Sequence, residues 1–167
     1  MPSSVKCTIR LFYSLLVTLF LASTAQAAVL YDVTLLDGVR QARAGNPVTP
    51  PLSSDFSFLG TPAPLTDATL EVSASGDFDG SNEFLHVFAE GIFLGDLFMG
   101  AGFEILTTEM LTIPQAVLLG LTSDGTVDVL LEGTSGGPNN VNILTVESVR
   151  LTYRGVPDDL SPELGPV

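Results

Sequence analysis

The chain has 167 residues, 46% of them hydrophobic, with 6 Lys or Arg against 19 Asp or Glu and a formal net charge of −13 at pH 7. A chain this acidic lacks the basic patch that releases counterions from nucleic acids or binds anionic lipid surfaces. We therefore expect neither as a partner, which leaves cations and uncharged polymers as ligand classes.

The first 27 residues have the features of a secretory signal peptide. Lys6 and Arg10 precede an apolar run from Leu11 to Ala22, and Ala25-Gln26-Ala27 is a small-residue cleavage site. The run is shorter than the about 20 apolar residues that a membrane helix needs, so no membrane insertion is expected. We expect cleavage near Ala27 and a secreted protein that works outside the cell, at its surface or in the periplasm.

Residues 28 to 154 are expected to form one β-sandwich domain. The only cysteine, Cys7, lies in the leader, so the secreted chain must be stabilised by its core rather than by disulfides. The secreted part of the chain contains four arginines, 19 acids and no lysine, which gives it a formal charge of −15. Residues 41 to 66 are rich in proline and read as a long connection, and the acidic tail 155 to 167 is expected to be disordered.

The first predicted strands lie between the leader and residue 75. Val29, Tyr31, Val33 and Leu35 share one side of an alternating segment, as in a half-buried strand. The segment "DFSFLG" is predicted as a short edge strand within the proline-rich connection. "ATLEVSAS" alternates strictly, and its buried face is predicted to consist of Ala68, Leu70, Val72 and Ala74.

Three more strands are predicted in the middle of the chain. "FLHVFA" and "IFLGDLF" are joined by Glu90-Gly91, and a glycine in second place suits a tight hairpin turn that needs positive φ. "FEILTTEMLTI" follows as another strand with poorer alternation.

The C-terminal third contains the only helical signal and two further strands. Pro114 opens and Gly120 closes a segment that is long enough for a turn or two of helix. The last two strands bury Val127, Val129 and Leu131, then Val149, Leu151 and Tyr153. Seven to eight strands with at most one short helix predict an all-β fold, an antiparallel β-sandwich of jelly-roll type.

Oxygen-bearing side chains gather between two predicted strands. They are Asp77, Asp79, Ser81, Asn82 and Glu83, and calcium takes six to eight oxygen ligands of this kind. The spacing is not that of an EF-hand, because the glycine and the bidentate glutamate of that motif are missing. Two interpretations stay open. One is a calcium site at Asp77, Asp79 and Glu83, completed by remote acids such as Asp96 or Asp124. The other is a hairpin loop whose acids face water.

His86, the only histidine, lies between Phe84 and Phe88 on a strand with two apolar faces, as expected for a central strand. One histidine without cysteine does not make a zinc site, and no G-x-S-x-G elbow supplies a nucleophile. The plain interpretation is a packed or partly exposed strand histidine. The functional one is a ligand surface in which Phe84, His86 and Phe88 form an apolar shelf for a sugar ring.

The sequence contains no recognisable catalytic constellation. A glycosidase needs two carboxylates about 5 to 9.5 Å apart, and 19 acids single out no pair. The absence of tryptophan weakens a sugar-binding interpretation, since Trp is the largest aromatic platform. No catalytic residues are predicted, and the protein is expected not to be an enzyme.

Residues 67 to 98 resemble a secreted bacterial β-sandwich module that occurs in many PEP-CTERM-type extracellular proteins. The shared pattern is G-D-[FL]-D-x-x-x-E followed by an aromatic strand and G-x-x-L-G, here Gly76, Asp77, Phe78, Asp79, Glu83, Gly91, Leu94 and Gly95. The resemblance implies a jelly-roll-like fold and an extracellular setting, and it transfers no catalytic residue. The chain departs from those proteins at its end, since "VPDDLSPELGPV" lacks their sorting tail.

These features favour a secreted, non-enzymatic binding module at the cell surface or in the extracellular matrix. Its expected partner is a neutral polysaccharide or a protein, and calcium is its expected cofactor. The alternative is a structural subunit of a surface layer or filament that assembles through strand edges or through "AVLYDVTLL". A glycosidase or lyase is the third reading.

Overall fold

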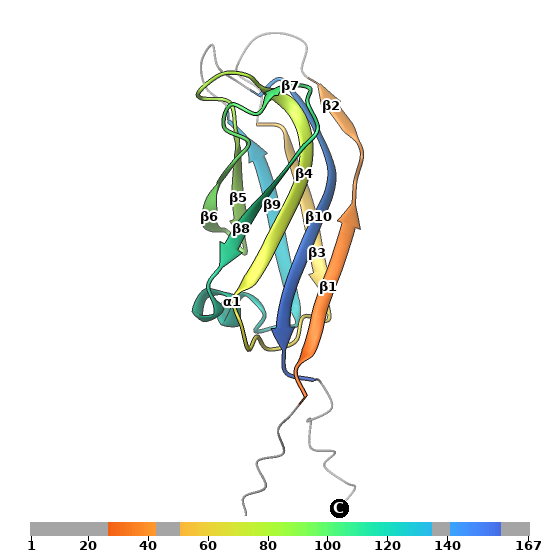
Figure 1. The fold of residues 1–167 in the computed structure, drawn as a ribbon, viewed down its shortest axis with the longest axis vertical. Coiled ribbons are helices and arrows are strands. Elements are labelled where there is room, and N and C mark those ends of the chain that lie inside the picture. The colour runs from red at the N-terminus through yellow and green to blue at the C-terminus, as the bar shows by residue number, and fades with distance from the viewer. Residues whose placement is uncertain (1–26, 43–50, 135–140, 158–167) are drawn as a thin grey trace, which may run out of the picture.

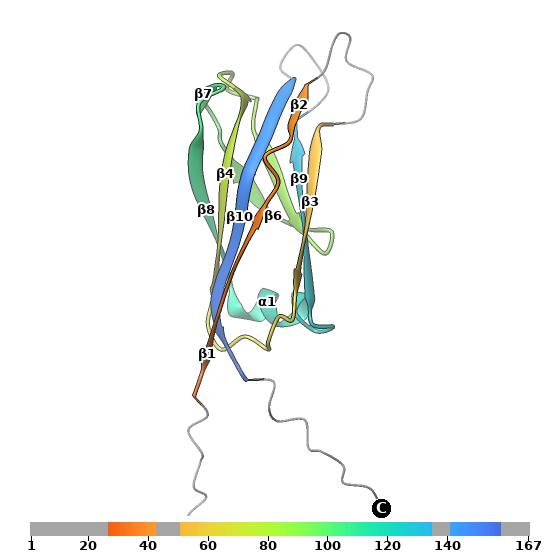
Figure 2. The same ribbon diagram turned by 90° about the vertical axis from the view of Figure 1, so that its right-hand side faces the viewer.

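The computed structural model describes residues 27–42, 51–134 and 141–157, in which two antiparallel sheets pack face to face (Figures 1 and 2). In sheet A the strands follow the order β1-β10-β4-β8, with short β2 beside β10 and short β7 beside β4, and in sheet B the order is β3-β9-β5-β6. The elements are β1 (Val29–Leu36), β2 (Arg40–Ala42), β3 (Ser53–Leu59), β4 (Ala68–Phe78), β5 (Leu85–Ala89), β6 (Ile92–Leu97), β7 (Gly102–Phe103), β8 (Thr107–Ile113), α1 (Gln115–Leu121), β9 (Thr126–Gly133) and β10 (Ile143–Gly155).

The longer strands pair in a nested pattern. β1 pairs with β10, β3 with β9, β4 with β8 and β5 with β6, all antiparallel. Successive pairs fall alternately in sheet A and sheet B, so the chain is one long antiparallel ribbon folded over on itself. This is the jelly-roll arrangement. The predicted all-β sandwich is therefore confirmed, with β2 and β7 as short additions to its eight longer strands.

The core lies between the sheets and is built from the predicted alternating faces. The inward residues of β4, β9 and β10 are buried as expected: Ala68, Leu70, Val72, Ala74, Val127, Val129, Leu131, Val149, Leu151 and Tyr153. Strand β1 is less covered, since Tyr31 is buried but Val29 is exposed. The reason is that β1 forms an edge of sheet A and pairs on one side only.

Two elements differ from their predicted bounds. "FEILTTEMLTI" was predicted as one strand, which is wrong, because Glu104 adopts a φ of 50° and divides it into β7 and β8. The Glu104 N–H then donates to the carbonyl of Gly76 at 2.6 Å. Helix α1 begins after Pro114 as predicted but extends past Gly120 to Leu121, which is buried with Leu118 where α1 closes one end of the sandwich (Figure 2).

Several predicted segments lie outside the described residues. They are the signal peptide up to residue 26, residues 43–50 of the proline-rich connection and residues 158–167 of the acidic tail. The described part of that connection contains β3, which is an edge strand of sheet B as predicted for "DFSFLG". Within the described residues no helix is long and apolar enough to cross a membrane.

Candidate functional site

The outer face of sheet B carries a cluster of aromatic side chains. Strand β5 lies between β9 and β6, and its buried side consists of Leu85, Val87 and Ala89. Because side chains alternate along a strand, Phe84, His86 and Phe88 point to the other, partly exposed side. Strand β6 adds Phe93, which lies opposite Phe88 in the register and is 53% exposed. We name Phe84, His86, Phe88 and Phe93 the aromatic cluster.

The rings of the aromatic cluster contact one another. The ring of His86 lies 5.1 Å from that of Phe84 and 5.9 Å from that of Phe93, both edge-on, and Phe88 and Phe93 are 5.6 Å apart. Edge-to-face contacts at these centroid distances are favourable. The predicted shelf is therefore a continuous partly exposed surface, and the residue that the sequence analysis missed in it is Phe93.

A carboxylate holds the histidine in this cluster. The Nδ1 of His86 lies 2.6 Å from an oxygen of Asp96, its register partner on β6. A bond to Nδ1 fixes the tilt of the imidazole ring and leaves Nε2 for another partner. Asp96 thus positions a polar group within the aromatic cluster.

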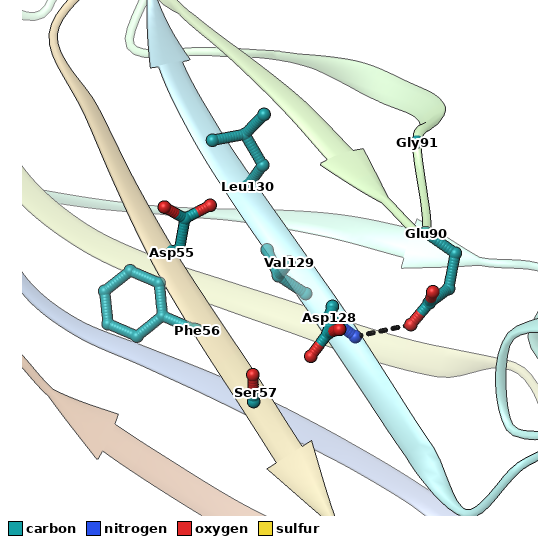
Figure 3. A pocket seen from close by; sticks show the side chains of 8 residues that line it. All are labelled: Asp55, Phe56, Ser57, Glu90, Gly91, Asp128, Val129 and Leu130. Atoms are coloured by element: carbon teal, nitrogen blue, oxygen red, sulfur yellow. Dashed lines mark hydrogen bonds between the residues drawn. The ribbon is translucent and has the colours of Figure 1, made fainter.

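An open pocket of about 360 Å³ continues the same face toward β3 (Figure 3). Its polar walls are Asp55 and Ser57 from β3, Asp128 from β9 and Glu90 from the β5–β6 turn. Ser57 and Asp128 are register partners, and one Glu90 oxygen accepts a hydrogen bond from the backbone N–H of Asp128 at 2.8 Å. The φ values of Glu90 and Gly91, 49° and 74°, confirm the predicted tight turn that brings Glu90 there.

The pocket and the aromatic cluster are parts of one surface. Leu130 of β9 lines the pocket and is also the register partner of Phe88. Across this face, the acids and the hydroxyl group of the pocket are followed by the aliphatic side chain of Leu130 and then by the aromatic rings of the cluster. A surface that combines carboxylates with aromatic rings suits a ligand with both hydroxyl groups and apolar ring faces.

Three acids, Asp77 near the end of β4 and Asp79 and Glu83 in the β4–β5 connection, converge. The end of β4 and this connection lie at the end of the sandwich opposite α1 (Figure 1). One carboxylate oxygen each of Asp77, Asp79 and Glu83 lies within 4.8 Å of the others. Glu83 is only 8% exposed, and its carboxylate accepts a hydrogen bond from the Gly80 N–H at 2.6 Å. Burial raises the pKa of Glu83, and the carboxylates of Asp77 and Asp79 add to this against the opposing Gly80 bond.

One residue from a distant part of the chain reaches this acidic cluster. The side-chain amide of Asn142, just before β10, donates to Asp77 at 3.4 Å. The two remote acids named from the sequence do not join it. Asp96 instead bonds to His86 on sheet B, and Asp124 accepts from the backbone N–H of Thr126.

The donor set of the acidic cluster fits a hard divalent cation. Its three carboxylates are oxygen ligands of the kind that calcium prefers, while Asn142 turns its amide N–H toward Asp77. A buried carboxylate beside two others is unfavourable without a counter-charge. The cluster therefore has both the ligand type and the electrostatic reason to bind calcium.

No family model and no curated protein matches the chain. Solved structures with a similar fold include the following three, at TM-scores of 0.40 to 0.46. One is dimeric latent PorU from Porphyromonas gingivalis (TM-score 0.46, 7% identity), where the match covers 77% of this chain and 13% of the other. Another is the C-terminal CBM6 of LamC, a marine laminarinase from Zobellia galactanivorans (0.45, 15%), with 74% and 100% covered. The third is carbohydrate-binding module CBM36 in complex with calcium and xylotriose (0.40, 15%), with 76% and 95% covered. Likeness at this level assigns no ligand to the chain.

Proposed function

We propose that the protein is a secreted, non-enzymatic module that binds a polysaccharide across the outer face of sheet B. The observation that carries the proposal is the partly exposed aromatic cluster that continues into the acidic pocket on the same face of the sheet. Sugar rings stack their C–H faces on aromatic side chains, and their hydroxyl groups donate to carboxylates. Calcium at Asp77, Asp79 and Glu83 stabilises the β4–β5 connection that leads into β5.

The shape of the face suits an extended chain rather than a single sugar. Neighbouring strands lie about 4.8 Å apart, so the path across β6, β5, β9 and β3 is roughly 14 Å long. The carboxylates on this path disfavour a polymer with negative charges. The extracellular setting follows from the predicted signal peptide and from the resemblance to secreted bacterial modules.

Phe93→Ala is expected to weaken polysaccharide binding about threefold to tenfold, because a stacked aromatic ring contributes about 0.5–1.5 kcal/mol. Phe93 is 53% exposed, so its removal leaves the core intact. Depletion of the purified protein by insoluble cellulose, chitin, xylan and β-glucan identifies the polymer, and titration with its oligomers gives the affinity. The matched control is Phe103→Ala on β7 of sheet A, whose side chain is 50% exposed.

Two results would contradict this proposal. Equal loss of binding in both phenylalanine variants would show that the aromatic cluster is not the ligand surface. Release of reducing ends from the polymer, abolished by Asp55→Asn or Asp128→Asn, would make the acidic pocket the active site of a glycosidase or lyase.

A second candidate function is assembly through β1. This strand forms an edge of sheet A and exposes apolar side chains, with Leu30 at 64% and Leu36 at 80%. Unpaired apolar edges add strands from other copies. If assembly is the function, light scattering after size-exclusion chromatography shows oligomers that grow with concentration and that Leu30→Lys/Leu36→Lys abolishes. A strict monomer at all concentrations excludes it.

A further inference from the structure

The two outer faces of the sandwich differ in charge. Sheet B and its β5–β6 turn carry five acids toward solvent: Asp55, Glu90, Asp96, Asp128 and Glu132. The three described arginines, Arg40, Arg150 and Arg154, all lie on the sheet A strands β2 and β10. In the described part of sheet B, His86 is therefore the one basic side chain.

Sheet A neutralises much of its charge and sheet B does not. Arg150 donates to both oxygens of Asp32 at 2.7 Å, and these bonds hold the pKa of Asp32 below its usual range. Arg40 pairs with Glu104 at 2.7 Å. On sheet B, His86 faces Asp96 and Glu132 in the register, and the pocket acids Asp55, Glu90 and Asp128 have no basic side chain beside them on the described strands.

The pocket acids are spaced apart rather than gathered on one point. Within the described residues, the only group of three metal-ligating side chains close enough to share an ion is the acidic cluster of Asp77, Asp79 and Glu83. Asp55 and Asp128 are both exposed and lie on neighbouring strands, displaced diagonally by the register that pairs Asp55 with Leu130. Such spacing suits several separate positive charges along a ligand better than it suits a single ion.

We propose that the polysaccharide bound by sheet B is a polymer of amino sugars with free, protonated amines. This inference rests on the proposed function and specifies its ligand class. The sugar rings stack on the aromatic cluster, where cation–π attraction adds to the stacking, and the ammonium groups pair with Asp55, Asp128 and Glu90. Charge complementarity selects this occupant, since the face offers aromatic rings and unpaired carboxylates together.

A basic peptide is the rival ligand for an acidic face. One recurring way to recognise an extended peptide is to add it to a strand edge, where its backbone forms hydrogen bonds. The pocket lies instead on the face of the sheet, over the paired strands β3 and β9. The geometry therefore favours a ligand with ring faces over a peptide.

The test compares three oligosaccharides of equal length and linkage by titration calorimetry at one mildly acidic pH. They are hexamers of glucosamine, N-acetylglucosamine and glucose, of which only the first is cationic. The glucosamine hexamer is expected to bind about fivefold to tenfold tighter, and added salt should remove that advantage. Asp55→Asn/Asp128→Asn should lose most of this preference, read as the ratio of its affinity for the glucosamine hexamer to its affinities for the two neutral hexamers.

The control variant, Glu71→Gln/Glu147→Gln, removes the same charge from sheet A and should keep the preference for glucosamine. Equal binding of all hexamers by the unchanged protein overturns this inference and leaves the proposed function standing. If no hexamer binds, this inference is wrong, and depletion by the insoluble polymers then decides the proposed function separately. Equally tight binding of hexalysine, with the same dependence on Asp55 and Asp128, would show a general cation-binding face and overturn the amino-sugar assignment.

Discussion

Millimolar calcium is expected to raise the melting temperature of the purified protein by several degrees, and Asp77→Asn/Asp79→Asn is expected to abolish this shift. An ion that binds only the folded state adds about 2.7 kcal/mol when its free concentration is 100 times Kd. For a domain of this size such a gain moves the melting temperature by several degrees. Scanning calorimetry in calcium and in EDTA measures it, with magnesium as the smaller, more strongly hydrated comparison ion.

Glu83→Gln separates cation binding from an ordinary role in the loop. The pKa of Glu83 is raised from 4.5, so the folded state holds its proton more tightly than the unfolded state does. Without calcium, the wild-type protein should therefore lose stability as the pH rises above about 4.5, toward and through the raised pKa. The glutamine keeps an oxygen for the Gly80 N–H and carries no charge, so this part of the pH dependence should disappear.

The same variant should lose the response to calcium. At neutral pH in EDTA, Glu83→Gln is expected to be at least as stable as the wild type, because a buried charge beside two others is gone. In calcium the order should reverse. A full calcium shift in Glu83→Gln, or none in the wild-type protein, would leave the connection as a hairpin loop whose acids face water.

The strand faces could be predicted from the sequence because alternation depends only on local spacing. Val127, Val129 and Leu131 are buried because two residues per repeat bring them to one side of β9, whichever strand lies next to it. The turn at Glu90-Gly91 was predictable for the same reason, as its conformation follows from its own two residues. Nothing in the sequence around Glu104 indicates its positive φ, so the break between β7 and β8 was not predicted.

Contacts between distant segments could not be predicted. Asn142 reaches Asp77 because β10 pairs with β4 and places Leu144 opposite Gly76. The acidic pocket needs β3, β9 and the β5–β6 turn together, and no spacing in the sequence relates Asp55 to Asp128. The two proposed sites thus differ, because the acidic cluster is nearly contiguous in sequence while the ligand face exists only after the sheet has formed.

Gly76→Ala is expected to destabilise the protein by about 1–3 kcal/mol, the usual cost of forcing an extra methyl group into a packed site. A Cβ at this position would lie 2.7 Å from the backbone oxygen of Ile143 and 2.8 Å from the ring of Phe78. The backbone of β10 has little room to retreat because Leu144 pairs with Gly76 in the register. Urea unfolding measures the loss. Gly120→Ala is the control, since a Cβ there meets nothing within 4 Å and should stabilise α1 by up to about 1 kcal/mol.

The Gly76→Ala variant also tests whether the packing of Gly76 and Phe78 positions the two acids that alternate with them, Asp77 and Asp79. Gly76 lets β10 approach, Phe78 is fully buried and stacks on Phe98 with ring centroids 5.3 Å apart, and alternation leaves Asp77 and Asp79 on the opposite side. A methyl group at residue 76 should therefore displace Asp77 and weaken the calcium shift as well as the fold. If Gly76→Ala unfolds like the wild type and keeps its calcium shift, the close approach of β10 does not position the acidic cluster.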